Sequence, residues 1–240
     1  MSYADNNPYR SWGMIAADAQ PNERLGFIRK TYMHLAGAVL ALVALEAVLL
    51  NAPFTPDLIS MMVGNRFSWL IVFGVFMGVT WMANSMAQSN TSPRVQYAGL
   101  GLYIVAEAVI FLPLLYIANQ FGDGTVIPTA GLITLLLFGG LTAIVFMTGA
   151  DFSFLRTGLM IAGLAALGLM LCSALFGFNM GVLFTVAMIA LMCGYILYDT
   201  SNVLHHYHIG QHVAASLALF ATIVTLFWYI LQLVMSLNRR

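Results

Sequence analysis

Residues 213–236 read VAASLALFATIVTLFWYILQLVMS, a stretch without one charged side chain. A helix needs about 20 mostly apolar residues to cross the hydrocarbon layer of a membrane. Similar stretches recur along the chain, and we predict seven spans, at about residues 33–50, 68–88, 97–118, 126–148, 156–177, 180–200 and 213–236. Short loops join them, so the predicted fold class is all-α, a polytopic membrane protein with a seven-transmembrane-helix bundle. Gly158, Ala162 and Ala166 have the spacing that lets helices approach closely in lipid.

The composition agrees with a membrane protein and excludes other classes. Of the 240 residues, 61% are hydrophobic and 8% are charged, whereas soluble domains carry roughly 25% charged residues. The 9 Lys and Arg residues balance the 9 Asp and Glu residues, so there is no basic excess of the kind that nucleic acid binding requires. Cys172 and Cys193 both lie in apolar runs and are interpreted as core residues rather than as disulfide or zinc ligands.

The distribution of polar residues predicts the domain organisation and the orientation. We expect a polar cytosolic N-terminal tail over 1–32, one transmembrane domain over 33–237 and a basic C-terminal tail over 238–240. No apolar core close to the start marks a cleavable signal peptide. Loops rich in Lys and Arg stay on the cytoplasmic side. If the N-terminus lies in the cytoplasm, more Lys and Arg residues fall on that side than on the other. That side would hold Arg10, Arg24, Arg29, Lys30, Arg94 and Arg156, and the other side Arg66, Arg239 and Arg240. Short loops throughout suit a bacterial inner membrane.

Three acidic residues, Glu46, Glu107 and Asp199, fall within the predicted spans. An ionised carboxylate in the bilayer is costly, so such residues usually face the bundle interior, where they pair, are protonated or line an ion path. No Lys or Arg lies in the central part of a span to serve as a partner. For Glu107 a functional role and a buried, hydrogen-bonded structural role are both open. Glu46 is expected to extend toward the outer interface, and Asp199 has the alternative of capping a turn with Thr200 or Ser201.

The surroundings of Asp199 form a recognisable motif. Residues 195–201 read YILYDTS, and three further segments agree with it: FIRKTY at 27–32, DFSFL at 151–155, and AA at 214–215 followed by LFWY at 226–229. Together these segments resemble the Bax inhibitor family, also called transmembrane Bax inhibitor motif proteins, over about residues 27–234.

The resemblance implies a seven-helix bundle with the last helix near the centre and a calcium leak gated by pH. In that mechanism one aspartate in each of the last two helices shares a proton, and the contact opens when both ionise. The first aspartate falls on Asp199, but the second falls on Thr222 and the family's later arginine on Gln232. We therefore hypothesise that Asp199, beside Thr222, lines or gates the cytosolic mouth, and that Glu107 supplies a second carboxylate. Glu46, Tyr198 and His205 are possible accessory residues.

Other chemistries have weaker support in the sequence. His205, His206, His208 and His212 crowd one loop, which is interpreted as interfacial or pH-responsive rather than as a metal site, since zinc needs three or four converging ligands. No second membrane aspartate, membrane lysine or phosphate-binding glycine loop indicates an enzyme or a cofactor. We expect the lipid bilayer as partner and calcium ions or protons as permeants. The competing classes are a non-conducting regulator acting through lipid or protein partners and a small-solute or proton-coupled transporter.

Overall fold

The computed structural model describes residues 14–89, 92–121 and 124–238, which form eight helices. They are α1 (Pro21–Leu50), α2 (Thr55–Val63), α3 (Arg66–Ala87), α4 (Pro93–Phe121), α5 (Val126–Thr148), α6 (Leu155–Phe176), α7 (Gly181–His205) and α8 (His212–Asn238). All but α2 are long and apolar enough to cross a membrane, so seven candidate spans are present. The predicted all-α, polytopic fold class is thereby confirmed.

The helices differ most from the expected spans at the start of α1 and in the presence of α2. Helix α1 begins at Pro21, within the segment 1–32 that was expected to be a tail. Proline at the first turn and the acidic Glu23 both favour a helix start, and this local chemistry outweighs the polarity of the segment. Helix α2 occupies a connection that was expected to be a loop. Residues 1–13 of the expected tail and three residues used for the orientation, Arg10, Arg239 and Arg240, lie outside the described residues.

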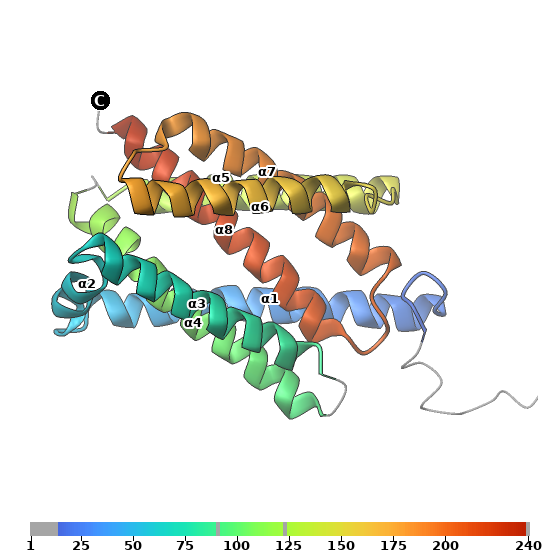
Figure 1. Ribbon diagram of the computed structural model, residues 1–240. Coiled ribbons are helices and arrows are strands. Elements are labelled where there is room, and N and C mark those ends of the chain that lie inside the picture. Colours follow the sequence, from blue (N-terminus) through green and yellow to red (C-terminus); the bar gives the residue numbers. More distant parts are fainter. Residues whose placement is uncertain (1–13, 90–91, 122–123, 239–240) are drawn as a thin grey trace, which may run out of the picture.

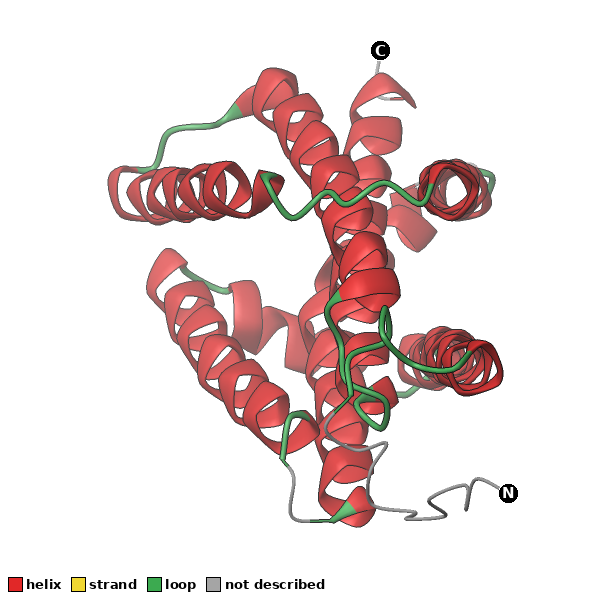
Figure 2. Cartoon of the chain, turned by 90° about the vertical axis from the view of Figure 1, so that its right-hand side faces the viewer, coloured by secondary structure: helices red, strands yellow, loops and turns green. Residues whose placement is uncertain are grey.

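Helix α8 forms the centre of the bundle, as the family resemblance implied. In Figure 1 it crosses between α3 and α4 on one side and α5, α6 and α7 on the other, and Figure 2 shows the same helix surrounded in the turned view. In its most apolar stretch 61% of the residues are buried, compared with 11% in α3 and in α6. Buried Ser216 on α8 donates a hydrogen bond to the carbonyl oxygen of Thr31 on α1 at 2.8 Å.

The closest helix packing is between α3 and α4. A Cβ atom added at Gly99 would lie 2.6 Å from the carbonyl oxygen of Ala83, so only glycine fits there without a shift. Of the three small residues predicted to give α6 a close approach, only Ala166 is buried, at 7% exposure; a Cβ atom added at Gly158 would meet nothing within 4 Å, and Ala162 is exposed. These two small residues face outward, because α6 packs mainly on α7.

The bundle has two ends that carry different polar groups. The first, called here the α7–α8 end, gathers the loop before α6, the loop before α8 and residues 14–20. There the amide of Ala16 donates to the carbonyl oxygen of Tyr207 at 2.8 Å. The amide of Ile209 donates to the carbonyl oxygen of Met14 at 2.9 Å. The opposite end, called the α6–α7 end, contains the connection from Gly177 to Met180 and the last turn of α8.

Candidate functional site

Asp199 and Thr222 meet between α7 and α8. The Thr222 hydroxyl donates to Asp199 Oδ2 at 2.6 Å, and its oxygen also lies 3.2 Å from the carbonyl oxygen of Ala218 one turn earlier. Thr222 is only 7% exposed. The sequence alignment placed these two residues opposite one another, and the structure brings them into direct contact.

A hydroxyl opposite a carboxyl group can hydrogen-bond in both protonation states, because it is donor and acceptor at once. When Asp199 is ionised, the Thr222 proton points to the carboxylate. When Asp199 is protonated, its own O–H can donate to the Thr222 oxygen, and the Thr222 proton can then turn to the Ala218 carbonyl, for which the 3.2 Å separation is suitable. A hydroxyl–carboxyl contact therefore survives a change of protonation that would drive two carboxylates apart.

Tyrosines lie near Asp199 on both sides along the bundle. Burial, followed by the negative charge of Asp199, raises the pKa of the Tyr207 hydroxyl above its usual range. Tyr195, one helical turn before Asp199, donates to the carbonyl oxygen of Leu159 on α6 at 3.0 Å. Tyr198 is half-buried beside Asp199. His205 ends α7, and its Nε2 atom is buried without a hydrogen-bond partner among the described residues.

Glu107 lies elsewhere, at the wall of a cavity of about 730 Å³. It is 3% exposed, and its side-chain hydrogen-bond partner is Tyr103, one turn earlier on α4. Helix α4 continues through Pro113 without a break. Gln232 lines the same cavity, whereas Asp199 and Thr222 do not. Asp199 and Glu107, which the sequence hypothesis placed in one mechanism, therefore lie in separate surroundings.

Glu46 does not extend to an interface. It is 5% exposed on α1, and neither of its carboxyl oxygens has a hydrogen-bond partner among the described residues. The expectation that its side chain reaches outward is wrong, because α1 packs this face against α4 and α8. Glu46 is a buried acid that does not line the Glu107 cavity.

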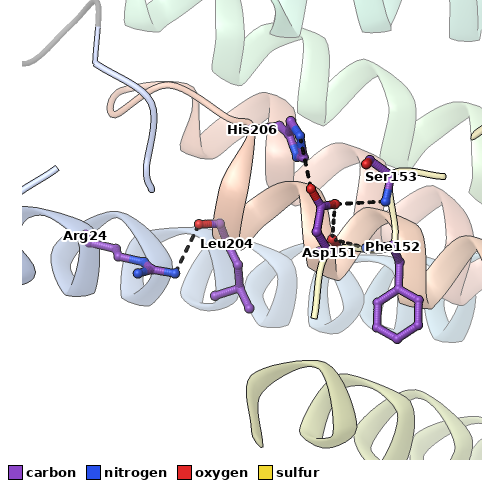
Figure 3. Close-up of polar contacts among 7 residues, drawn as sticks. Arg24, Asp151, Phe152, Ser153, Leu204 and His206 are labelled. Carbon is purple, nitrogen blue, oxygen red and sulfur yellow. Dashed lines mark hydrogen bonds and ion pairs between the residues drawn. The ribbon is translucent and has the colours of Figure 1, made fainter. Parts of the chain in front are cut away.

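A polar cluster at the α7–α8 end was not predicted from the sequence, where Asp151 appeared only as the first residue of the DFSFL segment. Asp151 Oδ1 accepts from the amide of Ser153 at 2.9 Å and from the Ser201 hydroxyl at 3.3 Å, and Oδ2 lies 3.7 Å from His206 Nε2 (Figure 3). The Ser201 hydroxyl oxygen also accepts from the amide of Phe152 at 2.8 Å. The Ser153 amide contributes most to holding the pKa of the Asp151 carboxyl below its usual range.

This cluster fastens the loop between α5 and α6 to α7, two residues beyond Asp199. The signal available in the sequence was the spacing Asp-Phe-Ser, because an aspartate commonly hydrogen-bonds the amide two residues on. On the other side of the same helix end, Arg24 Nη2 donates to the Leu204 carbonyl oxygen at 3.2 Å (Figure 3). A cation at the C-terminal end of a helix is favourable. The last turns of α7 are thus held by α1 and by the α5–α6 loop.

The crowded histidines separate in space. His206 faces Asp151, His208 lies 3.3 Å from Gln211 Oε1, and His212 Nε2 lies 3.3 Å from the Tyr97 hydroxyl. The His212 ring also contacts that of His34, with centroids 5.0 Å apart. In the part of the chain that the structure describes, no three His, Cys, Asp or Glu side chains gather into a metal-binding group.

These features define the class as a seven-helix membrane protein that encloses its last helix and keeps carboxyl groups buried around it. The sequence profile of the family described as inhibitor of apoptosis-promoting Bax1 matches residues 24–240. The chain therefore belongs to the Bax inhibitor family.

Several named proteins are similar over most of their length. Protein LIFEGUARD 3 of Arabidopsis thaliana is 26% identical over 93% of this chain and 90% of its own. Bax inhibitor 1 of Schizosaccharomyces pombe is 27% identical over 90% of this chain and 79% of its own. The Golgi anti-apoptotic protein of vaccinia virus is 26% identical over 96% of this chain and 93% of its own.

Proposed function

We propose that this protein is a slow cation leak, passing Ca²⁺ or protons, in which the contact between Asp199 and Thr222 holds α7 against α8 and closes the path. The observation that carries the proposal is the 2.6 Å hydrogen bond between these two side chains, inside the bundle and between its two last helices. Membership of the Bax inhibitor family supports it, because the resemblance assigns the gate to these two positions.

The chemistry of the contact sets the expected response to pH. A hydrogen bond to a carboxylate is roughly twice as strong as one to a neutral group. The closed contact is therefore firmer when Asp199 is ionised, and we expect the leak to fall as the pH rises. Two titratable side chains near Asp199 are the tyrosines Tyr195 and Tyr207. This sign is opposite to that of a two-aspartate latch, which opens when both acids ionise.

We further propose that the N-terminus and the α7–α8 end face the cytoplasm of a bacterial cell. The support is the distribution of cations. The α7–α8 end has Arg24, Arg29 and Lys30 in the first third of α1, with Arg94 and Arg156 in the first turns of α4 and α6, whereas Arg66 begins α3 at the other end. A cysteine replacing exposed Asn179, in a chain whose Cys172 and Cys193 are changed to Ser, tests this. A membrane-impermeant maleimide applied outside intact cells should label it, and protection from the reagent would reverse the orientation.

Reconstitution into liposomes tests the leak itself. Vesicles holding a calcium dye and a pH dye are exposed to steps of external Ca²⁺ and of pH, with protein-free vesicles as the blank. The expected result is a flux above the blank that falls as the pH rises. Asp199→Asn should remove this dependence, because the amide does not titrate, while Glu46→Gln, at another buried acid, should keep it.

Three outcomes count against the proposal. Traces equal to the blank at every pH, from protein that elutes as a folded species, would refute conduction and favour a non-conducting regulator. An unchanged pH profile in Asp199→Asn would remove Asp199 from the gate. Equal loss of the profile in Glu46→Gln would show that any buried acid serves, and that the Asp199–Thr222 contact has no special part.

A further inference from the structure

The cavity beside Glu107 lies among five helices of the bundle. Its walls come from α3, α4, α6, α7 and the second half of α8, and its rim at the α6–α7 end includes the exposed residues Asn179 and Val182. Outer helices α3 and α6 make little contact across it. A volume of about 730 Å³ falls in the range of small-molecule sites, roughly 300–1,000 Å³.

One acid stands in this cavity without a counter-charge. Glu107 is the acidic residue of the wall, and none of the lining residues that the structure describes is Lys, Arg or His. The other polar side chains include Thr225, Gln232 and Ser236 on α8, which are neutral. A buried carboxyl group with no cationic partner favours a ligand that brings the positive charge with it.

Aromatic rings make up much of the remaining wall. Trp69 comes from α3, Tyr103 and Phe111 from α4, and Trp228 and Tyr229 from α8. The Phe111 and Trp228 rings are in edge contact with centroids 5.0 Å apart. Aromatic faces attract organic cations and bury apolar groups equally well. Calcium, by contrast, takes six to eight oxygen ligands, and the side-chain partner recorded for Glu107 is the single hydroxyl of Tyr103.

We propose that this cavity is a binding site for a lipophilic amine, whose ammonium group pairs with Glu107 and whose apolar body lies against the aromatic wall. The proton count balances without charge crossing the membrane. A neutral amine that enters from the bilayer takes the proton of the Glu107 carboxylic acid, which leaves an ammonium–carboxylate pair. The site does not depend on ion flux, because binding is an equilibrium that is measured without a gradient.

Direct binding to the full chain in lipid nanodiscs tests the proposal. The probe is tritiated imipramine, a tricyclic tertiary amine, and the competitor is an uncharged amide built on the same ring system. We expect saturable binding that the amide does not displace. Glu107→Gln should weaken it by about tenfold or more, the usual loss when a charged hydrogen bond is removed. Glu46→Gln is the matched control, a buried acid off the cavity wall, and should bind as the wild type does.

A second variant keeps the test decisive if Glu107→Gln does not fold. Gln232→Lys places a cation on the same wall, where it competes with the amine, and should abolish binding. A photoreactive diazirine derivative of the amine should label peptides that line the cavity, such as the one around Asn179. Binding that is equal in wild type, Glu107→Gln and Gln232→Lys, displacement by the amide, or labelling confined to other helices would each overturn the proposal. None of these outcomes bears on the leak, which the liposome traces decide separately.

Discussion

Replacing Thr222 with Val removes the hydroxyl that holds Asp199 while keeping the shape of the side chain. The lost interaction is a hydrogen bond of 2.6 Å to a carboxyl group in a partly buried contact. Hydrogen bonds to charged groups contribute about 1.5–3 kcal/mol. If the contact exists only in the closed state, its loss shifts the closed–open equilibrium toward the open state by a factor of about 10 to 150, since 1.4 kcal/mol corresponds to tenfold.

The assay is the initial rate of dye-reported Ca²⁺ entry into liposomes at neutral pH, with equal amounts of protein. The expected rate for Thr222→Val is at least about ten times that of the wild type, up to the limit set by the open path. Thr222→Ser retains the hydroxyl and should stay close to the wild type. Thr134→Val is a control for the loss of a buried threonine hydroxyl, because Thr134 donates to Ala130 of its own helix at 2.7 Å.

A Thr222→Val rate equal to that of the wild type would refute the assignment of this contact to the closed state. A lower rate would refute it as well, because it would mean that the hydroxyl supports the open path. An increase that Thr134→Val reproduces would trace the effect to a loosened bundle rather than to the contact with Asp199. Only variants that elute as a single folded species in size-exclusion chromatography are included in this comparison of flux rates.

Three further perturbations test other contacts. Thr222→Asp should reverse the pH response, because two carboxylates about 4 Å apart repel by about 4 kcal/mol at an effective dielectric constant of about 20; flux that still falls with rising pH would contradict this. Gly99→Ala should lower the melting temperature measured by tryptophan fluorescence, because its Cβ meets the Ala83 carbonyl oxygen, whereas Gly101→Ala, with nothing within 4 Å, should not. The lowered pKa of Asp151 predicts stability that is present above its ordinary value of 3.8 and lost as the pH falls through the lower folded value. Asp151→Asn should therefore melt below the wild type at about pH 6, and the difference in melting temperature should shrink as the pH is lowered below 3.8; a difference that does not shrink would refute this.

The sequence predicts the seven spans well because a membrane helix must satisfy its backbone internally and be apolar over a known length. It predicts helix ends less well. Pro21 starts α1 inside a polar segment, and α2 forms from only nine residues. Such ends depend on local capping and on packing, which hydropathy does not report.

The residues of the candidate site could be predicted only where they belong to a recognised sequence motif. The YILYDTS motif and the alignment of the last helix placed Asp199 opposite Thr222, and the structure records their hydrogen bond. The burial of Glu46 could not be predicted, because a position near the end of a span says nothing about which neighbours cover it. The Gly99 contact with Ala83 was missed for a similar reason. A single glycine in a helix does not indicate which helix approaches it. The regular spacing of Gly158 and Ala162 predicted a close approach of another helix, but these two residues face outward.

Helix α8 contributes a neutral residue to each of two separate carboxyl sites, those of Asp199 and Glu107. The family resemblance expects an aspartate and an arginine on α8, and this chain has the neutral residues Thr222 and Gln232 there. Thr222 belongs to the Asp199 site and Gln232 to the Glu107 cavity. Thr222 bonds Asp199 toward the α7–α8 end, and Gln232 lines the Glu107 cavity toward the α6–α7 end. With both charges of α8 absent, neither acid is paired to a fixed ion. Asp199 is then governed by a hydroxyl that tolerates both protonation states, and Glu107 is left to a partner that arrives from outside the chain. In the proposed leak, Thr222 in place of an aspartate gives a weaker pH response; in the proposed amine site, Gln232 in place of an arginine leaves Glu107 free to pair with a cationic ligand.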